Sequence, residues 1–299
     1  MIAHRLKRFA AKPFDQKVLT LRFFVRRGLA KLPFVPITVR FRMSPAETIS
    51  LWWSQVIPTF HADRDFLDYW GEDIDGLCFL WNILEPGMVF FDVGAYHGLY
   101  TLVAAQKVRE QGHIVAFEPS PRERRRLRLH LRLNRLSRVD VEAYAVGLHS
   151  GTRKFFLVAS ADTSMNSLQP PAIQDALEEI SVQTISLDEY CQRAGIGRVD
   201  LIKIDAEGGE LEIFQGARQV LTAMRPLIIC EVLDRVTLPW GYRAREIVAA
   251  LASHRYAWFE FRPGGTLLPH APRQDYPEVA NYLAVPEEKL GLVQSRVRD

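Results

Sequence analysis

The chain has 299 residues, 48% of them hydrophobic, and a formal net charge of +3. It is long enough to bury one large core with an appendage, and it contains no apolar run near the roughly 18 residues that a membrane span needs. Its three cysteines, Cys78, Cys191 and Cys230, are far apart and lack partners at metal-binding spacing, so they indicate reduced core thiols in a cytoplasmic protein and exclude a disulfide scaffold.

Positive charge is concentrated at the start of the chain. Residues 1–42 hold eleven Lys or Arg and one acid, a balance of +10, and the remainder holds 27 bases and 34 acids, a balance of −7. Two stretches, 2–12 and 17–32, place apolar residues on one helical face until prolines end each run. Two interpretations stay open: peripheral docking on an anionic membrane, or a helical cap on the main domain. The acidic remainder argues against a nucleic-acid partner.

An aromatic-rich segment, residues 46–85, precedes the first core strand. We expect it to be helical, with its aromatic side chains mostly in the core, and stacking on a sugar ring is the alternative. Residues 1–84 are therefore predicted to form a basic, helical N-terminal extension.

The stretch VFFDVGAYHG, residues 89–98, organises the rest of the chain. Its first three residues are typical of a buried strand, and the chain then turns at Asp92 and Gly94. Glycine lets a backbone approach a bound molecule closely, and the apolar residues after Gly98 suit a helix packed back on a sheet. Exposed amides at the start of such a helix attract negative groups.

A second strand, residues 113–117, ends in Glu118, twenty residues after Gly98. A carboxylate at the tip of a second parallel strand can accept two hydrogen bonds from a ribose diol. The glycine turn is not the G-x-G-x-x-G of dinucleotide enzymes. Turn and acid together predict a nucleoside site, and the alternative is a buried strand with a turn glycine.

A capping box, Ser120-Pro121-Arg122-Glu123, predicts the start of the next helix. Its several arginines could suggest nucleic-acid binding. Leucines at spacings of three and four indicate a buried side instead, so we interpret the arginines as a solvated face.

An insertion is expected between the third and fourth core strands. The third strand is predicted at 139–146, extended segments at 153–158 and 182–185, and a helix between Ser186 and Gly195. Loops at this edge of a sheet commonly cover substrate, so the polar residues 162–167 are a candidate lid, with an ordinary mobile loop as the alternative.

The fourth core strand, residues 199–205, carries three candidate catalytic residues. A lysine is rarely buried unless it is paired, so Lys203, Asp205 and Glu207 are predicted to form a charge network at the strand's carboxyl end. The alternative is that Asp205, Glu207 and Glu210 only complement the dipole of the next helix.

Strands predicted at 226–231, 256–261 and 281–285, with a helix at 243–254, complete the chain. Because strands alternate with helices until two consecutive strands, the pattern predicts an α/β fold. We expect residues 291–299 to be a frayed tail.

These motifs resemble the FkbM-type S-adenosylmethionine-dependent methyltransferases. The resemblance covers roughly residues 87–251, through FDVGA at 91–95 with Gly98, AFEP at 116–119, Asn134, AVG at 145–147, LDEY at 187–190, DLIKID at 200–205 with Glu207, Gly208 and Glu210, GA at 216–217, and Glu231. Two departures stand out. Tyr96 and His97 replace the asparagine and apolar residue usual between the glycines, and Gly209 stands where alanine is usual.

The resemblance implies a fold, a cofactor and a reaction. The fold is a Rossmann-like seven-stranded methyltransferase sheet over residues 85–290, mostly parallel, with an antiparallel last strand and helices on both faces. The reaction is O-methylation of a hydroxyl on a sugar, glycolipid or polyketide-like molecule. The residues expected to bind S-adenosylmethionine are Asp92, Gly94, Ala95, Gly98, Glu118 and Ala145.

Methyl transfer to an alcohol depends on positioning, worth up to about 7–11 kcal/mol, and on a general base, worth about 10²–10⁴ in rate. The base should lie at the carboxyl end of the sheet, which ranks Asp205 first, Glu207 second and His97 third, with Lys203 holding Asp205 ionised. Two acids are thin evidence for a divalent cation, so no metal site is predicted.

Two other functions stay open. A non-catalytic methyltransferase-like module could hold a nucleoside and a protein partner through the basic leader, and methyl transfer to any acceptor would exclude it. A nicotinamide-dependent oxidoreductase is disfavoured by the missing glycine motif, and binding of NAD without S-adenosylmethionine would revive it. The sequence leaves the acceptor and the oligomeric state open.

Overall fold

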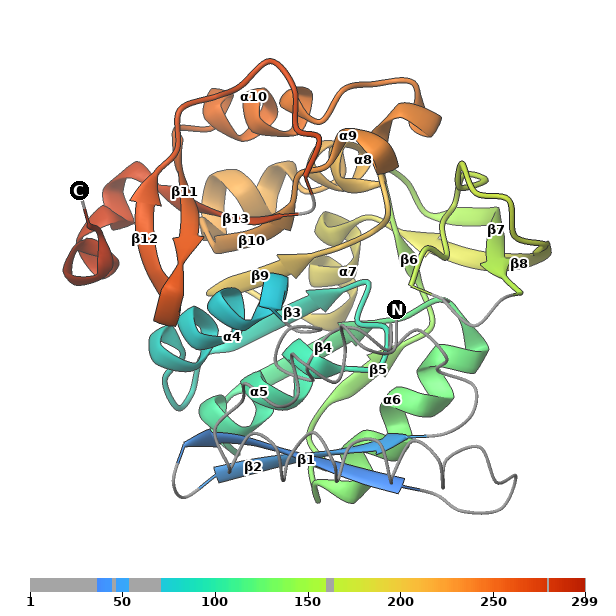
Figure 1. Ribbon diagram of the computed structural model, residues 1–299, viewed down its shortest axis with the longest axis horizontal. Coiled ribbons are helices and arrows are strands. Elements are labelled where there is room, and N and C mark those ends of the chain that lie inside the picture. Colours follow the sequence, from blue (N-terminus) through green and yellow to red (C-terminus); the bar gives the residue numbers. More distant parts are fainter. Residues whose placement is uncertain (1–36, 45–46, 54–70, 160–163, 279, 299) are drawn as a thin grey trace, which may run out of the picture. The chain divides into compact units, whose positions relative to one another are not determined.

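The structure, a computed structural model, describes residues 37–44, 47–53, 71–159, 164–278 and 280–298 (Figure 1). The chain divides into two compact units, Met1–Gly71 and Glu72–Asp299. The two basic amphipathic segments predicted within residues 1–36 lie outside the described residues.

The described part of the first unit is a β-hairpin. Strands β1 (Ile37–Ser44) and β2 (Glu47–Trp53) pair antiparallel, with Ile37 opposite Trp53. The prediction of a helical extension is therefore wrong over these residues. Their sequences, ITVRFRMS and ETISLWW, are rich in β-branched and aromatic residues at alternate positions, which is a strand pattern.

Helix α4 (Gly71–Ile83) forms the last part of the predicted extension, and it falls almost entirely within the second unit. Phe79 and Leu80 on this helix are completely buried, and the ring of Phe79 lies 5.5 Å from that of Phe261, centroid to centroid. The predicted domain boundary at residue 84 is therefore too late, because α4 contributes to the core of the second unit.

The second unit is built on an eight-stranded sheet in the order β12-β11-β13-β10-β9-β3-β4-β5. Neighbouring strands from β10 to β5 pair parallel, whereas β13 lies antiparallel between β10 and β11. The predicted α/β sheet with an antiparallel last strand is confirmed, and β12 adds an eighth strand at the edge. The strands are β3 (Val89–Val93), β4 (His113–Phe117), β5 (Asp140–Glu142), β9 (Leu201–Ile204), β10 (Leu227–Glu231), β11 (Tyr256–Arg262), β12 (Thr266–Pro269) and β13 (Asn281–Pro286).

The helices begin where the sequence signals them. Ser120 and Ser186 each accept a hydrogen bond through Oγ from the backbone N–H three residues later, at 3.4 and 3.2 Å, which confirms both serines as N-caps. The reciprocal bond of a capping box is not formed at Ser120, because its backbone N–H donates to Glu118. Within the described part of the chain, no helix combines the length and apolar character that crossing a bilayer requires.

The helices are α5 (Leu99–Val108), α6 (Pro121–Leu133), α7 (Leu187–Ala194), α8 (Glu210–Gln215), the π-helix η1 (Val220–Met224), α9 (Asp234–Thr237), the 3-10 turn η2 (Leu238–Trp240) and α10 (Arg245–Ser253).

The central strands are buried on both faces. Phe90 and Phe91 are adjacent in β3 and therefore point to opposite sides of the sheet, yet both are fully buried. On the Phe91 side, strand residues pack in one cluster with α7, α8 and α10. This explains why the core strands are continuous apolar runs rather than alternating ones.

A second, three-stranded sheet comes from the insertion. It contains β6 (Ala145–Val146), β7 (Gly151–Val158) and β8 (Leu177–Ile185) in the order β6-β8-β7, drawn in green to yellow in Figure 1. The strand predicted at 139–146 is thus divided: its first part pairs with β4 in the main sheet, and its last part pairs with β8.

The order of the strands reverses at β3, which has β4 on one side and β9 on the other. In open α/β sheets, ligands bind beyond the carboxyl ends of the strands at such a switch point. The topology therefore brings the turns after β3, β4 and β9 together at one edge.

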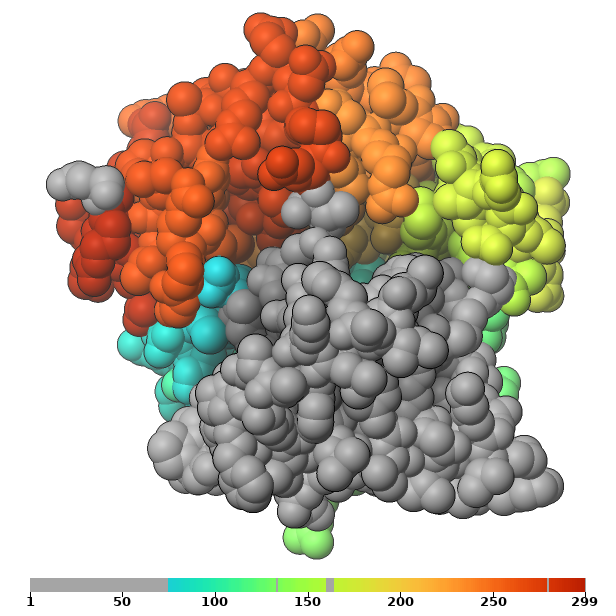
Figure 2. Space-filling view, in the orientation of Figure 1, coloured from blue at the N-terminus to red at the C-terminus, as the bar shows by residue number. Residues whose placement is uncertain are grey.

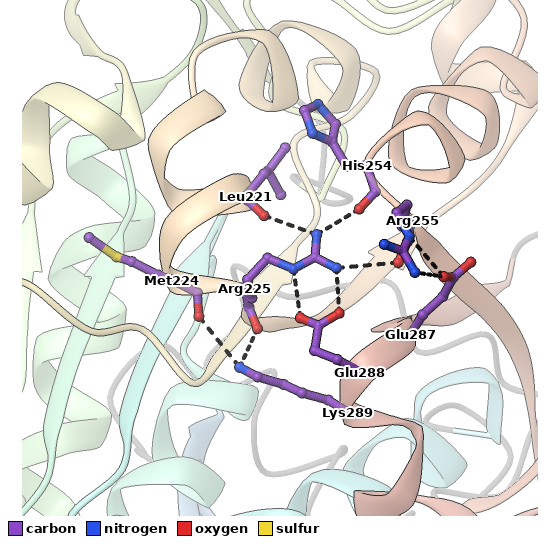
Figure 3. A network of polar contacts seen from close by, with 8 residues as sticks. All are labelled: Leu221, Met224, Arg225, His254, Arg255, Glu287, Glu288 and Lys289. Atoms are coloured by element: carbon purple, nitrogen blue, oxygen red, sulfur yellow. Dashed lines mark hydrogen bonds and ion pairs between the residues drawn. The ribbon is translucent and has the colours of Figure 1, made fainter.

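Arg225 lies at the other end of the strands, just before β10, where it joins three segments of the chain (Figure 3). Its guanidinium makes a bidentate pair with Glu288, at 2.7 and 2.8 Å, and donates to the carbonyl oxygens of Leu221, His254 and Arg255. We call this contact set the Arg225 clamp. It ties the starts of β10 and β11 to the segment after β13.

The C-terminal tail is bonded to the sheet. Two 3-10 segments, η4 (Glu287–Leu292) and η5 (Gln294–Arg296), follow β13, and the backbone N–H of Arg298 donates to the Leu267 carbonyl at 2.9 Å. The prediction of a frayed tail is therefore wrong as far as Arg298.

Candidate active site

A cleft opens at the carboxyl ends of β3, β4 and β9 and encloses about 560 Å³. Its lining includes Gly94 after β3, Glu118 after β4, and Asp205 and Glu207 after β9. The insertion closes the remaining side with Ala145 and several apolar residues. Five of the ten predicted site residues therefore line one cleft, which we call the main cleft.

The glycine turn after β3 is packed against the turn after β9. Gly94 has a φ of +77°, and a Cβ added there would lie 1.8 Å from the Asp205 carbonyl oxygen. The backbone N–H groups of Gly94 and Ala95 both donate to the Phe117 carbonyl, at 3.1 and 3.0 Å. Only glycine permits this approach, which brings the β3, β4 and β9 turns into contact.

Three predicted cofactor residues support the main cleft from outside its lining: Asp92, Ala95 and Gly98. Asp92 is buried and accepts a hydrogen bond from the Thr101 hydroxyl, and burial raises its pKa to about 6. Gly98 has a φ of +86°, and a Cβ there would meet Leu127 Cδ1 at 2.1 Å. Gly98 therefore lets α6 pack against the turn.

Glu118 has the position and chemistry expected of a ribose-binding acid. It is 5% exposed, and its two carboxylate oxygens accept hydrogen bonds from the backbone N–H groups of Tyr96 and Ser120, at 2.7 and 2.8 Å. Burial raises the pKa of Glu118 to about 8. Because each carboxylate oxygen has a further lone pair, the carboxylate can also accept from two vicinal hydroxyls, so this residue fits a nucleoside.

An apolar wall stands beside Glu118. It is formed by Tyr144, Ala145, Phe155 and Leu168, all from the segment that contains the insertion. Apolar and aromatic side chains next to a ribose-binding acid suit the flat ring of a nucleobase. The sequence identified Ala145 but not the others, and of these only Phe155 lies in a strand, β7.

Lys203 and Asp205 form the ion pair that the sequence predicted. The Lys203 ammonium donates to Asp205 Oδ2 at 3.0 Å, and it lies 5.2 Å from the centre of the Tyr100 ring. The lysine side chain is 2% exposed, whereas that of Asp205 is 36% exposed. A buried cation thus stands behind a carboxylate that reaches the main cleft.

Glu207 occupies a strained turn whose backbone is held from two sides. Its φ is +50°, and its carbonyl oxygen accepts from Trp240 Nε1 at 3.0 Å and from Ser167 Oγ at 2.9 Å. Burial, followed by the nearby carboxyls of Glu231 and Asp205, raises the pKa of Glu207 well above its usual value.

Glu210, the first residue of α8, holds the turn that precedes this helix. Its Oε1 accepts from the backbone N–H of Ala206 at 2.8 Å and of Gly208 at 3.4 Å, and burial raises its pKa to about 7. Of the three acids considered for the helix dipole, only Glu210 lies in the first turn of α8, whereas Asp205 and Glu207 precede the helix and line the main cleft.

His97 is not among the residues that line the main cleft. Its Nε2 lies 2.6 Å from Glu123 Oε2, its ring stacks on that of Tyr96 with centroids 3.6 Å apart, and burial lowers its pKa. The structure thus does not bring His97 together with Asp205 and Glu207. Tyr96, by contrast, lines the main cleft and was not proposed as a site residue.

Gly209 makes room for Trp240. A Cβ at Gly209 would lie 3.3 Å from Trp240 Cη2 and 3.4 Å from the Cβ of Ala206. The glycine that departs from the resemblance therefore lies directly against an indole ring, which the sequence analysis did not connect with the site.

Among the described residues, no group of three or more His, Cys, Asp or Glu is arranged to hold a metal ion.

Comparison with known proteins identifies a family. The sequence matches the methyltransferase FkbM domain over residues 92–257, more than half of the chain. It is 28% identical over 188 residues to the 2-O-methyltransferase NoeI of Sinorhizobium fredii, and 29% identical over 202 residues to the 31-O-demethyl-FK506 methyltransferase FkbM of Streptomyces tacrolimicus. Each match covers 58% of this chain and 74% of the relative. A solved O-methyltransferase from Bacillus cereus, in complex with SAH, aligns with a TM-score of 0.41 and 14% identity over 75% of this chain and 83% of its own.

Proposed function

The chain belongs to the FkbM methyltransferase family, and from this premise we propose that it methylates a hydroxyl of a sugar, glycolipid or polyketide-like molecule. It is an S-adenosylmethionine-dependent methyltransferase. The names of both relatives specify transfer to oxygen, which supports a hydroxyl acceptor. The observation that carries the proposal is that Glu118, Asp205 and Glu207 line a single cleft.

The main cleft offers a place for each part of the cofactor's nucleoside. Glu118 would accept hydrogen bonds from the ribose, and the wall formed by Ala145 and Phe155 would cover the adenine ring. Gly94 lines the same cleft and keeps the turns after β3 and β9 in contact. When bound, the cofactor supplies an electrophilic methyl group on a sulfonium centre.

Asp205 is the general base in this proposal. Asp205 lines the main cleft, where its carboxylate could accept the hydroxyl proton of the acceptor, and the ion pair with Lys203 at 3.0 Å holds this carboxylate in place. Glu207 is the second candidate, because it lines the same cleft and has a raised pKa. His97 has no part in the proposed reaction, because its ring is bonded to Glu123 outside the cleft lining.

Labelled methyl transfer tests the proposal. The protein would be incubated with methyl-labelled S-adenosylmethionine and purified pools of sugars, glycolipids and polyketides, and labelled product is expected in one pool. Cofactor binding without transfer to any pool would favour the non-catalytic module.

Two amide variants then test the base. Asp205→Asn should bind S-adenosylhomocysteine normally and lose about 10²–10⁴ in turnover, because an amide cannot take the proton. Glu207→Gln is the matched variant. Near-normal turnover of Asp205→Asn with loss in Glu207→Gln would move the base to Glu207, and near-normal turnover of both would remove general-base catalysis by these acids.

A further inference from the structure

A second, shallow hollow, open to solvent, lies beyond the main cleft. One wall comes from residues 165–172 of the insertion and the other from residues 235–240, after β10. The space-filling view shows the yellow-green atoms of the insertion and the orange atoms of the segment after β10 exposed on one face (Figure 2). Since the insertion lies outside the main sheet, this hollow is a feature added to the core fold.

Glu207 lines both the second hollow and the main cleft. A molecule in the second hollow would therefore lie next to a molecule in the main cleft, with Glu207 at the boundary between them. An acceptor hydroxyl placed there would be near the proposed cofactor position and near Asp205, which also lines the main cleft.

The lining of the second hollow combines apolar, amide and cationic groups with the acid Glu207. Trp240, Pro171 and Pro239 provide apolar surface, and Gln169 contributes a side-chain amide. Aromatic surface next to a few hydrogen-bonding groups is typical of a site for a polar ring such as a sugar.

Arg235 is the cation of this hollow. The hydrogen bond recorded for its guanidinium goes to the sulfur of Met165 at 3.7 Å, and a thioether is a weak acceptor. Arg235 is exposed, and its charge acts on the carboxyl group of Glu207. Within the described part of the chain, no acid lies within ion-pair distance of it, whereas Arg243, which is also exposed, pairs with Asp275 at 2.6 Å. Arg235 therefore has most of its five N–H donors available to a ligand.

The backbone that carries Arg235 is fixed. The neighbouring Asp234 is 8% exposed, and its carboxylate accepts from the backbone N–H groups of Ala244 and Tyr276 at 3.0 and 2.6 Å. The facing loop is held by the bond from Ser167 Oγ to the Glu207 carbonyl at 2.9 Å. Both walls are thus attached to the rest of the second unit, which is what a preorganised binding site requires.

We propose that the second hollow binds the methyl acceptor, and that Arg235 recognises an anionic oxygen group on it, so that the acceptor is an acidic sugar carrying a carboxylate, phosphate or sulfate. The guanidinium fork matches each of these groups bidentately. This inference rests on the proposed function and names its substrate class.

Calorimetry with matched sugars tests the inference. Glucuronate, glucose 6-phosphate, glucose 6-sulfate and neutral glucose would be titrated into the full chain, with and without S-adenosylhomocysteine. At least one acidic sugar should bind about tenfold or more tightly than glucose, which is the size expected of a charge-assisted hydrogen bond, and the three acids distinguish the possible anions.

Variants of Arg235 test whether this residue causes the preference for acidic sugars. Arg235→Gln should remove the preference for the acidic sugar, and Arg235→Lys should retain part of it because the charge remains. Arg218→Gln, which alters an exposed arginine after α8, is the control and should behave as the unmodified chain.

Equal binding of acidic and neutral sugars, absence of binding by every acidic sugar, or a preference that survives Arg235→Gln would each overturn the inference. If the proposed function itself were wrong, S-adenosylhomocysteine would not bind in the same titrations, which is a different result. Methyl transfer confined to neutral acceptors would overturn the inference and leave the proposed function intact.

Discussion

The raised pKa of Glu118 predicts that cofactor affinity depends on pH. In the unliganded protein this pKa is about 8, so about one tenth of the carboxyl groups are ionised at pH 7 and about nine tenths at pH 9. Because a ribose diol donates to the carboxylate, binding at pH 7 must first remove a proton, at a cost of about 1.4 kcal/mol. Affinity for S-adenosylhomocysteine should therefore rise about tenfold between pH 7 and pH 9 and then level off.

Calorimetry at several pH values, in two buffers of different ionisation enthalpy, would measure both the affinity and the protons released on binding. The amino group of the ligand also titrates in this range, so Glu118→Gln is the control: it shares the ligand's titration but lacks that of Glu118. At each pH, the affinity of the unmodified chain divided by that of Glu118→Gln should therefore report the titration of Glu118 alone. Glu118→Ala should also bind more weakly while remaining folded.

Parallel pH dependences of the unmodified chain and Glu118→Gln would refute the reasoning, and unchanged affinity in a folded Glu118→Ala would remove the ribose assignment altogether. The stability of the unliganded protein should change in the opposite direction. Since the folded pKa lies above the usual value of 4.5, the contribution of Glu118 to stability is present below pH 4.5 and is lost as the pH rises through about 8.

Three further predictions concern other parts of the chain. Replacing Arg225 by methionine should cost about 2 kcal/mol of stability, because Glu288 and three carbonyl groups lose their donor, without changing S-adenosylhomocysteine affinity; an unchanged Tm would show that the Arg225 clamp contributes nothing. The full chain should co-sediment with anionic vesicles in a salt-sensitive way, with about 1 kcal/mol for each basic residue near the surface, and a chain without residues 1–42 should not. Equal sedimentation of both chains, or binding indifferent to lipid charge, would give residues 1–42 a structural role. Gly209→Ala should shift the Trp240 ring and weaken acceptor binding more than S-adenosylhomocysteine binding, and an unmoved ring in a crystal structure of the variant would contradict this.

Most of the elements that the sequence predicted correctly are determined by residues close to one another in the chain. The apolar run at residues 89–91, the N-caps Ser120 and Ser186, and the left-handed Gly195 each determine an element through contacts a few residues apart. The strand expected at 139–146 could not be divided from sequence alone. Whether Ala145 pairs with β4 or with β8 depends on a partner, Thr184, that is distant in the chain.

For the site, the sequence predicted the position of the cleft but not the role of each residue in it. Glycines and acids at strand ends identified the main cleft, but sequence spacing cannot distinguish residues that line it from residues that support it. Gly94 and Gly98 look equivalent in sequence, yet one lies against the Asp205 carbonyl and the other against Leu127. His97 looked available as a base because its partner Glu123 lies 26 residues away, in helix α6.

The contact between Gly209 and Trp240 constrains the order in which these two residues could be acquired. If tryptophan had appeared first opposite an alanine, the ring would have had to shift by a few tenths of an ångström from its present position. If glycine came first, it opened the space without a cost in helix propensity, because residue 209 is the N-cap of α8, where glycine is preferred over alanine, and the larger ring could follow without displacement. The same logic applies to directed evolution of acceptor preference: positions 209 and 240 should be randomised in one library, since changing either alone samples only mismatched pairs.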